Sequence, residues 1–128
     1  MRSDVNRLFV VLGSLNGALA VILGAFGAHG LENQLSERML AVFRTGVDYH
    51  FYHALGLLAV GLAAGPLGPL RRLHAAGWLM LGGIVIFAGT LYALALGGPG
   101  WLGAITPIGG TAFILAWLLL AAAAMSRR

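Results

Sequence analysis

Residues 45–57, TGVDYHFYHALGL, open an apolar run that continues to Ala64. The stretch contains one carboxylate, two phenols and two imidazoles, which belong to Asp48, Tyr49, His50, Tyr52 and His53. The sequence around it is apolar and rich in glycine. Polar side chains cost free energy where water is scarce, unless they bond to partners or serve a function. These five residues are therefore the first candidates for a site or for a polar layer.

The composition indicates a membrane protein. Of the 128 residues, 59% are hydrophobic and 9% are charged, and the mean hydropathy is +0.89. A soluble domain of this size cannot hide so much apolar surface. The chain has no cysteine, which excludes disulfides, thiolate metal sites and a cysteine nucleophile. The positive charge comes from arginines at the edges of apolar runs, a pattern of membrane topology that argues against nucleic-acid binding.

Four apolar runs predict four membrane spans, separated by turns rich in glycine and proline. The expected spans are residues 8–28, 46–64, 73–96 and 105–124. The first run would extend about 31 Å as a helix, which matches a bilayer core of about 30 Å. A cleaved signal peptide is the alternative for this run. We expect an all-α fold, an integral membrane four-helix bundle in which residues 1–128 form a single membrane domain.

Residues 31–45 differ from the four runs. Apolar residues recur there with helical period, and charged residues take the other side. The pattern predicts an amphipathic surface helix between the first and second spans. A short connector packed on the bundle is the alternative.

Small residues recur at spacings of three and four in the first span, among them Gly13, Gly17 and Gly24. Such a stripe lets two helices approach closely, either within the bundle or between subunits. We expect Gly82 and Gly89 to do the same in the third span. Alternatively, glycine is simply common in membrane helices.

Four spans place both ends of the chain on one side of the membrane. Six of the eight arginines then fall on that side, and only Arg38 and Arg44 fall on the other. The positive-inside rule predicts that both termini lie in the cytoplasm.

Four motifs follow one another along the chain, one in or beside each predicted span. They are GAFGAH at 24–29, YHFYHAL at 49–55, FAGTLY at 87–92 and TPIGG at 106–110. Together they resemble the DUF423 family of small membrane proteins, which includes the transmembrane protein 256 group. The resemblance covers nearly the whole chain. It implies a four-helix protein of the bacterial inner membrane with an unassigned molecular function, so no catalytic residue is carried over. The family motif has its histidine at the position of His53 and often a glutamine at that of His50.

The polar residues allow two interpretations, a structural hydrogen-bonded layer or a ligand site. His29 is expected on the same side of the membrane as the cluster at 48–53. We expect His29 and His53 to share one hydrogen-bonded layer with a tyrosine, and Asp48 to pair with Arg44 four residues away. The alternative is a ligand site: a metal held by His29, His50 and His53 with Asp48 behind them, or a haem with two axial histidines. No diagnostic metal or haem motif is present, so no cofactor is predicted.

The sequence supports two functions. The first is a structural or interaction protein that forms a homo-oligomer or docks on a larger membrane complex within the lipid bilayer. The second is a module that binds a metal, haem, quinone or lipid near His29 and His53. An enzyme is not favoured, because no serine or threonine lies beside a histidine in sequence and no catalytic residue is identified.

Overall fold

The computed structural model describes residues 2–68 and 70–126, and the described part of the chain is helical with short connections. Its elements are α1 (Arg2–His29), α2 (Glu37–Leu67), α3 (Arg71–Gly83), the π-helical turn η1 (Ile84–Ala88), α4 (Gly89–Ala95) and α5 (Leu102–Met125). Because α3, η1 and α4 follow one another without a break, they form one long helix. Four long helices result, each apolar enough and long enough to cross a membrane. The predicted all-α four-helix fold is confirmed.

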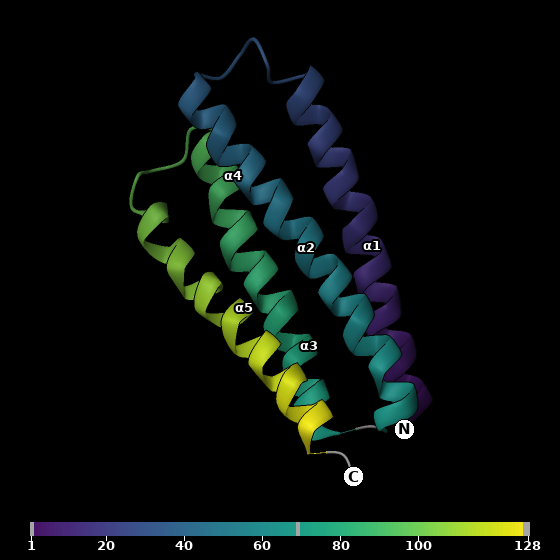
Figure 1. Cartoon of the computed structure of the whole chain (residues 1–128). Coiled ribbons are helices and arrows are strands. Elements are labelled where there is room, and N and C mark those ends of the chain that lie inside the picture. The colour runs from purple at the N-terminus through teal and green to yellow at the C-terminus, as the bar shows by residue number, and fades with distance from the viewer. Residues whose placement is uncertain (1, 69, 127–128) are drawn as a thin grey trace.

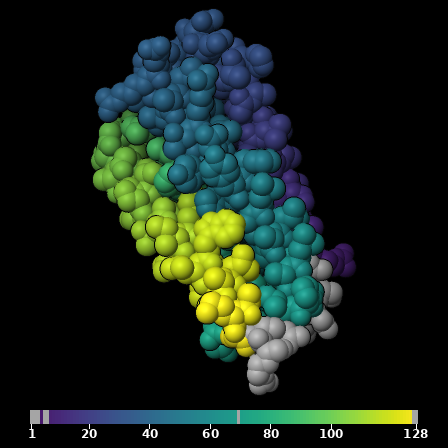
Figure 2. All heavy atoms as spheres, in the orientation of Figure 1, coloured from purple at the N-terminus to yellow at the C-terminus, as the bar shows by residue number. Residues whose placement is uncertain are grey.

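The helices run up and down beside one another (Figure 1). α1 begins and α5 ends at one end of the bundle, and residues 30–36 and 96–101 connect helices at the other end. α1 packs mainly on α2, and α5 packs mainly on α3 and η1. In the space-filling view of the same side, α2 and α5 make up most of the surface (Figure 2). α1 and α5 therefore lie on opposite flanks of a central pair.

Apolar side chains fill the bundle and also cover its outside. The main buried cluster includes Phe9, Leu57, Leu73, Met80 and Phe113. A smaller cluster around Phe43 lies near the end where residues 30–36 turn. Large apolar side chains are exposed on all four long helices, for example Leu15, Leu62, Val85 and Leu118. A surface of this kind suits lipid and not water.

The segment 31–45 is not a separate surface helix, which corrects this part of the prediction. α2 begins at Glu37, where the Ser36 hydroxyl caps it by accepting a hydrogen bond from the Met39 backbone N–H at 3.1 Å. The helix then runs through Gly46, the residue expected to begin the second span. A Cβ at Gly46 would lie 2.8 Å from Tyr92 Cε1, so this glycine makes room for a ring inside a continuous helix. α2 has 31 residues and is about 46 Å long.

The glycines differ in what they contact. A Cβ at Gly13 would lie 2.7 Å from the Leu58 backbone nitrogen, and a Cβ at Gly24 would lie 3.2 Å from the Val47 side chain. A Cβ at Gly17 would make only ordinary contact. At Gly82 and Gly89 a Cβ would meet no described atom within 4 Å. The expectation that these last two pack against a neighbouring helix is wrong within the chain, because both lie on open sides of the third long helix.

Adjacent glycines allow a direct test of this difference. We expect Gly82→Ala to leave stability unchanged or to raise it by about 0.5–1 kcal/mol, because alanine loses less backbone entropy in a helix. Gly83→Ala should destabilise the fold, because its Cβ would lie 2.5 Å from two ring carbons of Phe113. Thermal unfolding in detergent measures both. Equal melting temperatures for the two variants would contradict the packing described here.

Candidate functional site

His50 lies at the centre of a hydrogen-bonded chain that joins three helices. Its Nδ1 is 2.8 Å from the Tyr92 hydroxyl of α4, and its Nε2 is 3.0 Å from Asn16 Oδ1 of α1. The Asn16 amide nitrogen donates to the Leu12 carbonyl at 2.8 Å, so Asn16 Oδ1 is left to accept from His50. Nε2 therefore carries the proton, and Nδ1 accepts from Tyr92. His50 is 2% exposed and neutral in this arrangement.

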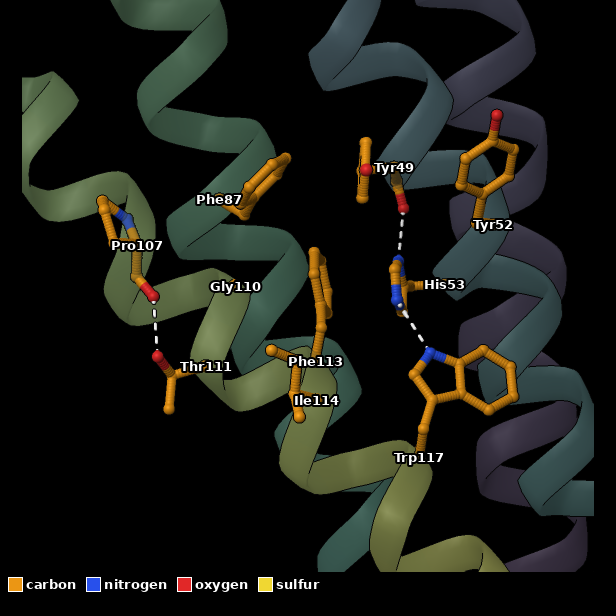
Figure 3. Close-up of a pocket in the computed structure, with 10 residues that line it drawn as sticks. All are labelled: Tyr49, Tyr52, His53, Phe87, Pro107, Gly110, Thr111, Phe113, Ile114 and Trp117. Atoms are coloured by element: carbon orange, nitrogen blue, oxygen red, sulfur yellow. Dashed lines mark hydrogen bonds between the residues drawn. The ribbon is translucent and has the colours of Figure 1, made fainter.

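His53 joins α2 to α5 in the same manner. The Trp117 indole N–H, which can only donate, bonds to His53 Nε2 at 3.0 Å. His53 Nδ1 therefore carries the proton and donates to the Tyr49 carbonyl at 2.7 Å. The imidazole also stacks on Phe113, with ring centroids 3.5 Å apart and an interplanar angle of 5°. Both ring nitrogens are thus used inside the protein, and the ring is fixed in position (Figure 3).

The structure does not bring His29 and His53 together. His29 is exposed at the end of α1. His53 comes sixteen positions after the start of α2, or about 24 Å along its axis, because α2 begins at Glu37 and not at Gly46. Among the described residues, no group of three or more histidine, aspartate or glutamate side chains is placed to hold a metal ion. The metal site of His29, His50 and His53 is therefore not formed.

Asp48 and Tyr52 lie on the outer side of α2, where both are exposed. Within residues 2–68 and 70–126, Asp48 forms no ion pair with Arg44, so this expected pair is not formed. The five candidates on α2 thus divide among different places. His50 is inside the bundle, Tyr49 and His53 line the space between α2 and α5, Asp48 faces outward, and Tyr52 lies at the border between those last two places.

A groove of about 620 Å³ lies between α2 and α5 (Figure 3). Six aromatic rings line it, those of Tyr49, Tyr52, His53, Phe87, Phe113 and Trp117. Phe87 comes from η1 and lies between the two flanking helices in the close-up. None of the described residues that line the groove is charged. The groove therefore suits an apolar or uncharged occupant.

Two local irregularities lie where α5 packs against the third long helix. The first is η1, where the Gly89 backbone N–H bonds to the Ile84 carbonyl. The second is Pro107 in α5, which has no N–H to donate. Between them, the hydroxyls of Thr90 and Thr106 are 2.6 Å apart. π-Turns inside α-helices occur frequently at functional sites, and this one places Phe87 in the groove.

Gly109 allows the close contact between α5 and η1. A Cβ at this position would lie 2.5 Å from the Phe87 backbone nitrogen and 2.9 Å from its Cα. α5 lies close to η1 and reaches α2 through Trp117 and Phe113. Trp117 hydrogen-bonds to His53, and Phe113 stacks on it. The groove is the space beside these contacts.

Most polar groups in the groove already have partners. The Thr111 hydroxyl donates to the Pro107 carbonyl at 3.0 Å, and His53 and Trp117 bond to each other. In the described part of the chain, the hydroxyls of Tyr49 and Tyr52 have no hydrogen-bond partner. Their rings meet edge to face, with centroids 5.5 Å apart. These two hydroxyls are the groups that a ligand would meet.

The groove lies near the middle of the predicted membrane layer. Ala54, next to His53, is the residue that a Cβ at Gly17 would meet, at 4.0 Å. Gly17 is close to the midpoint of the uncharged run 8–28. A ligand would therefore enter from the side, out of the lipid.

Five residues of these networks were not identified as site residues from the sequence: Asn16, Thr90, Tyr92, Thr106 and Trp117. Among them, Trp117 is the one whose hydrogen bond the sequence could have indicated, because an indole N–H within an apolar span needs an acceptor. The sequence offered no way to choose His53 as that acceptor, since α5 is apolar on all sides.

The fold and the groove define a small, all-helical integral membrane protein. More particularly, the chain belongs to the DUF423 family, since a family model described as "Protein of unknown function (DUF423)" matches residues 23–110. The chain is 50% identical over 119 residues to the UPF0382 membrane protein YwdK of Bacillus subtilis, covering 93% of this chain and 97% of that protein. It is 48% identical over 119 residues to a UPF0382 membrane protein of Staphylococcus epidermidis, covering 93% and 96%. No solved structure matches the chain. These relatives place the protein in a membrane, and their names assign no activity.

Proposed function

We propose that this protein is a membrane binding module that holds one uncharged, ring-bearing amphiphile in the groove between α2 and α5. The observation that carries the proposal is the lining of the groove, which combines six aromatic rings with no charged side chain. Its volume of about 620 Å³ falls within the range of about 300–1,000 Å³ that is usual for small-molecule sites. A flat ring would pack against Phe87 and Tyr49, and an apolar tail would extend into the lipid.

The hydroxyls of Tyr49 and Tyr52 would recognise the head of this ligand. Each can donate one hydrogen bond and accept others, so a carbonyl or hydroxyl oxygen on the ligand suits them. In the proposed role His53 is a positioning residue, because both of its nitrogens already bond within the protein. It keeps Phe113 and Trp117 in place as one wall of the groove. The same bonds argue against haem or metal ligation by His53.

We also propose that the protein lies in the bacterial inner membrane with both termini in the cytoplasm. Arg7, Arg71 and Arg72 support this orientation, since they lie at the end of the bundle where α1 begins and α5 ends. Arg38 and Arg44 lie toward the other end. Arg127 and Arg128, which were also counted for this side, lie outside the described residues.

Fluorescence of Trp117 would test the groove. In a Trp78→Phe, Trp101→Phe background, Trp117 is the only remaining tryptophan. The protein is placed in nanodiscs and titrated with a short-chain benzoquinone, an uncharged ring with an alkyl tail. We expect saturable quenching, because bound quinone lies beside the indole. Thr111→Phe should narrow the groove and weaken this quenching, whereas Leu115→Phe, on an exposed part of α5 outside the groove, should not.

A second arm replaces the quinone with a phospholipid brominated on its acyl chains. If the groove holds only lipid tails, the brominated lipid will quench Trp117 fluorescence, and adding the quinone will cause no saturable quenching. Quinone quenching that rises linearly with concentration and is equal in Thr111→Phe and Leu115→Phe would contradict the proposed function.

A further inference from the structure

The outward side of α2 carries an uncovered row of residues along most of its length. They recur at alternating spacings of four and three, and every one of them is exposed: Ala41, Thr45, Asp48, Tyr52, Leu55, Ala59 and Leu62. We call this row the α2 seam. Its spacing is that of helices that pack along one another at a shallow angle. Three of its members are small, which lets a second helix approach closely.

Asp48 is the residue in the α2 seam that needs a partner. Its neighbour Val47 is the residue that a Cβ at Gly24 would contact, at 3.2 Å. Gly24 lies four positions inside the end of the uncharged run 8–28, or about 6 Å below the edge of the apolar layer. The carboxylate is exposed at this depth, and within the described residues nothing pairs with it. Ionisable groups in membrane helices are rare on the lipid side and normally pair.

Arg44 is the matching charge. It lies one helical turn from Asp48 toward the membrane surface, on the same side of α2, and it is exposed. The two are not paired with each other in the chain. One turn is about 5.4 Å, a distance that an extended arginine side chain can cover. Each chain therefore presents one carboxylate and one guanidinium, close together and without partners among the described residues.

We propose that two copies of the chain pair through the α2 seam, about a two-fold axis along the membrane normal. Such an axis places equal residues at equal depth, so the two Asp48 residues lie opposite each other, and the Arg44 side chain of each copy reaches one helical turn to pair with Asp48 of the other. Two reciprocal ion pairs form, and both carboxylates leave the lipid. Tyr52 belongs both to the seam and to the lining of the groove, and the two reciprocal ion pairs do not involve it.

Cysteine crosslinking tests the geometry, since the chain has no cysteine of its own. Full-length protein in liposomes would carry Thr45→Cys or Leu55→Cys in the α2 seam, or Leu19→Cys on the exposed side of α1 as the matched control. We expect an oxidised dimer for the two seam variants and none for the control. Monomers at every protein-to-lipid ratio, or equal crosslinking at Leu19, would overturn the proposal.

Charge exchange between two differently tagged chains tests the ion pairs. Asp48→Arg gives a chain with two cations at these positions, and Arg44→Asp gives a chain with two anions. Each variant alone should dimerise at least about tenfold more weakly than the parent, because like charges face each other. Mixed together, the two variants should form heterodimers at parental strength. If Asp48 instead pairs with Arg44 of its own chain or of a different protein, mixing will restore nothing, and the proposal fails.

Discussion

Replacing His50 with leucine should lower the free energy of unfolding by about 2–4 kcal/mol, which makes it one of the most damaging changes in the chain. Leucine fills similar space but leaves the Tyr92 hydroxyl and Asn16 Oδ1 without their partner inside the bundle. Each unsatisfied buried group costs about 1–3 kcal/mol. Hydrogen bonds between membrane helices average nearer 0.6 kcal/mol, so the lower part of the range is expected if lipid or water reaches the site.

A second substitution separates the hydrogen bonds from the loss of packing. Tyr92→Phe removes the stranded hydroxyl, so the double variant with His50→Leu should be less damaged than the sum of the two single variants. Unfolding in mixed micelles with increasing denaturing detergent, followed by circular dichroism, gives the three free energies. Strict additivity would mean that His50 and Tyr92 do not share a bond.

Gly13→Ala should destabilise the protein by about 3 kcal/mol, at the upper end of the usual cost of overpacking. The added Cβ would lie 2.7 Å from the Leu58 backbone nitrogen and 2.8 Å from the Ala54 carbonyl oxygen. Both atoms belong to the backbone of α2 and cannot move aside as a flexible side chain can. α1 would have to separate from α2, and since α1 packs mainly on α2, it has few other contacts to hold it.

Gly17→Ala is the matched control, one turn further along the same helix. Its Cβ would meet only Ala54 Cβ, at 4.0 Å. We expect stability within about 0.5 kcal/mol of the parent, with the better helix propensity of alanine offsetting any crowding. Thermal unfolding in detergent and protease digestion of α1 would measure both variants. Equal behaviour of Gly13→Ala and Gly17→Ala would show that α1 does not pack on α2 as described.

The sequence predicted the four long helices because each apolar run is long enough to cross a bilayer and ends in charges, glycine or proline. It did not predict where α2 begins. The expected second span begins at Gly46, but in the structure this glycine lies inside α2 and provides space for the Tyr92 ring. That contact joins residues far apart in the chain, and no local pattern reveals it. The same error placed His53 near the membrane surface and therefore beside His29.

The candidate site was predicted in part. The stretch around Tyr49 and His53 was recognised as polar within an apolar run, and it does line the groove. The sequence could not show that His50 and His53, three positions apart, point into different networks. Their partners lie on α1, α4 and α5, and partner choice depends on how the helices are rotated against each other. The groove itself depends on η1, and the run Ile84–Ala88 contains no proline or glycine to mark a π-turn.

The third long helix contains two helical phases that meet at η1. Each residue of an α-helix turns by about 100°, and a π-turn accommodates one residue more than an α-turn does. Side chains beyond Ala88 are therefore set about one position out of phase with those before Ile84. Removing a single residue from 84–88 would do more than shorten the helix. It would bring the two halves into one phase and turn Tyr92 away from His50 and Thr90 away from Thr106, so both interhelical bonds depend on one extra residue.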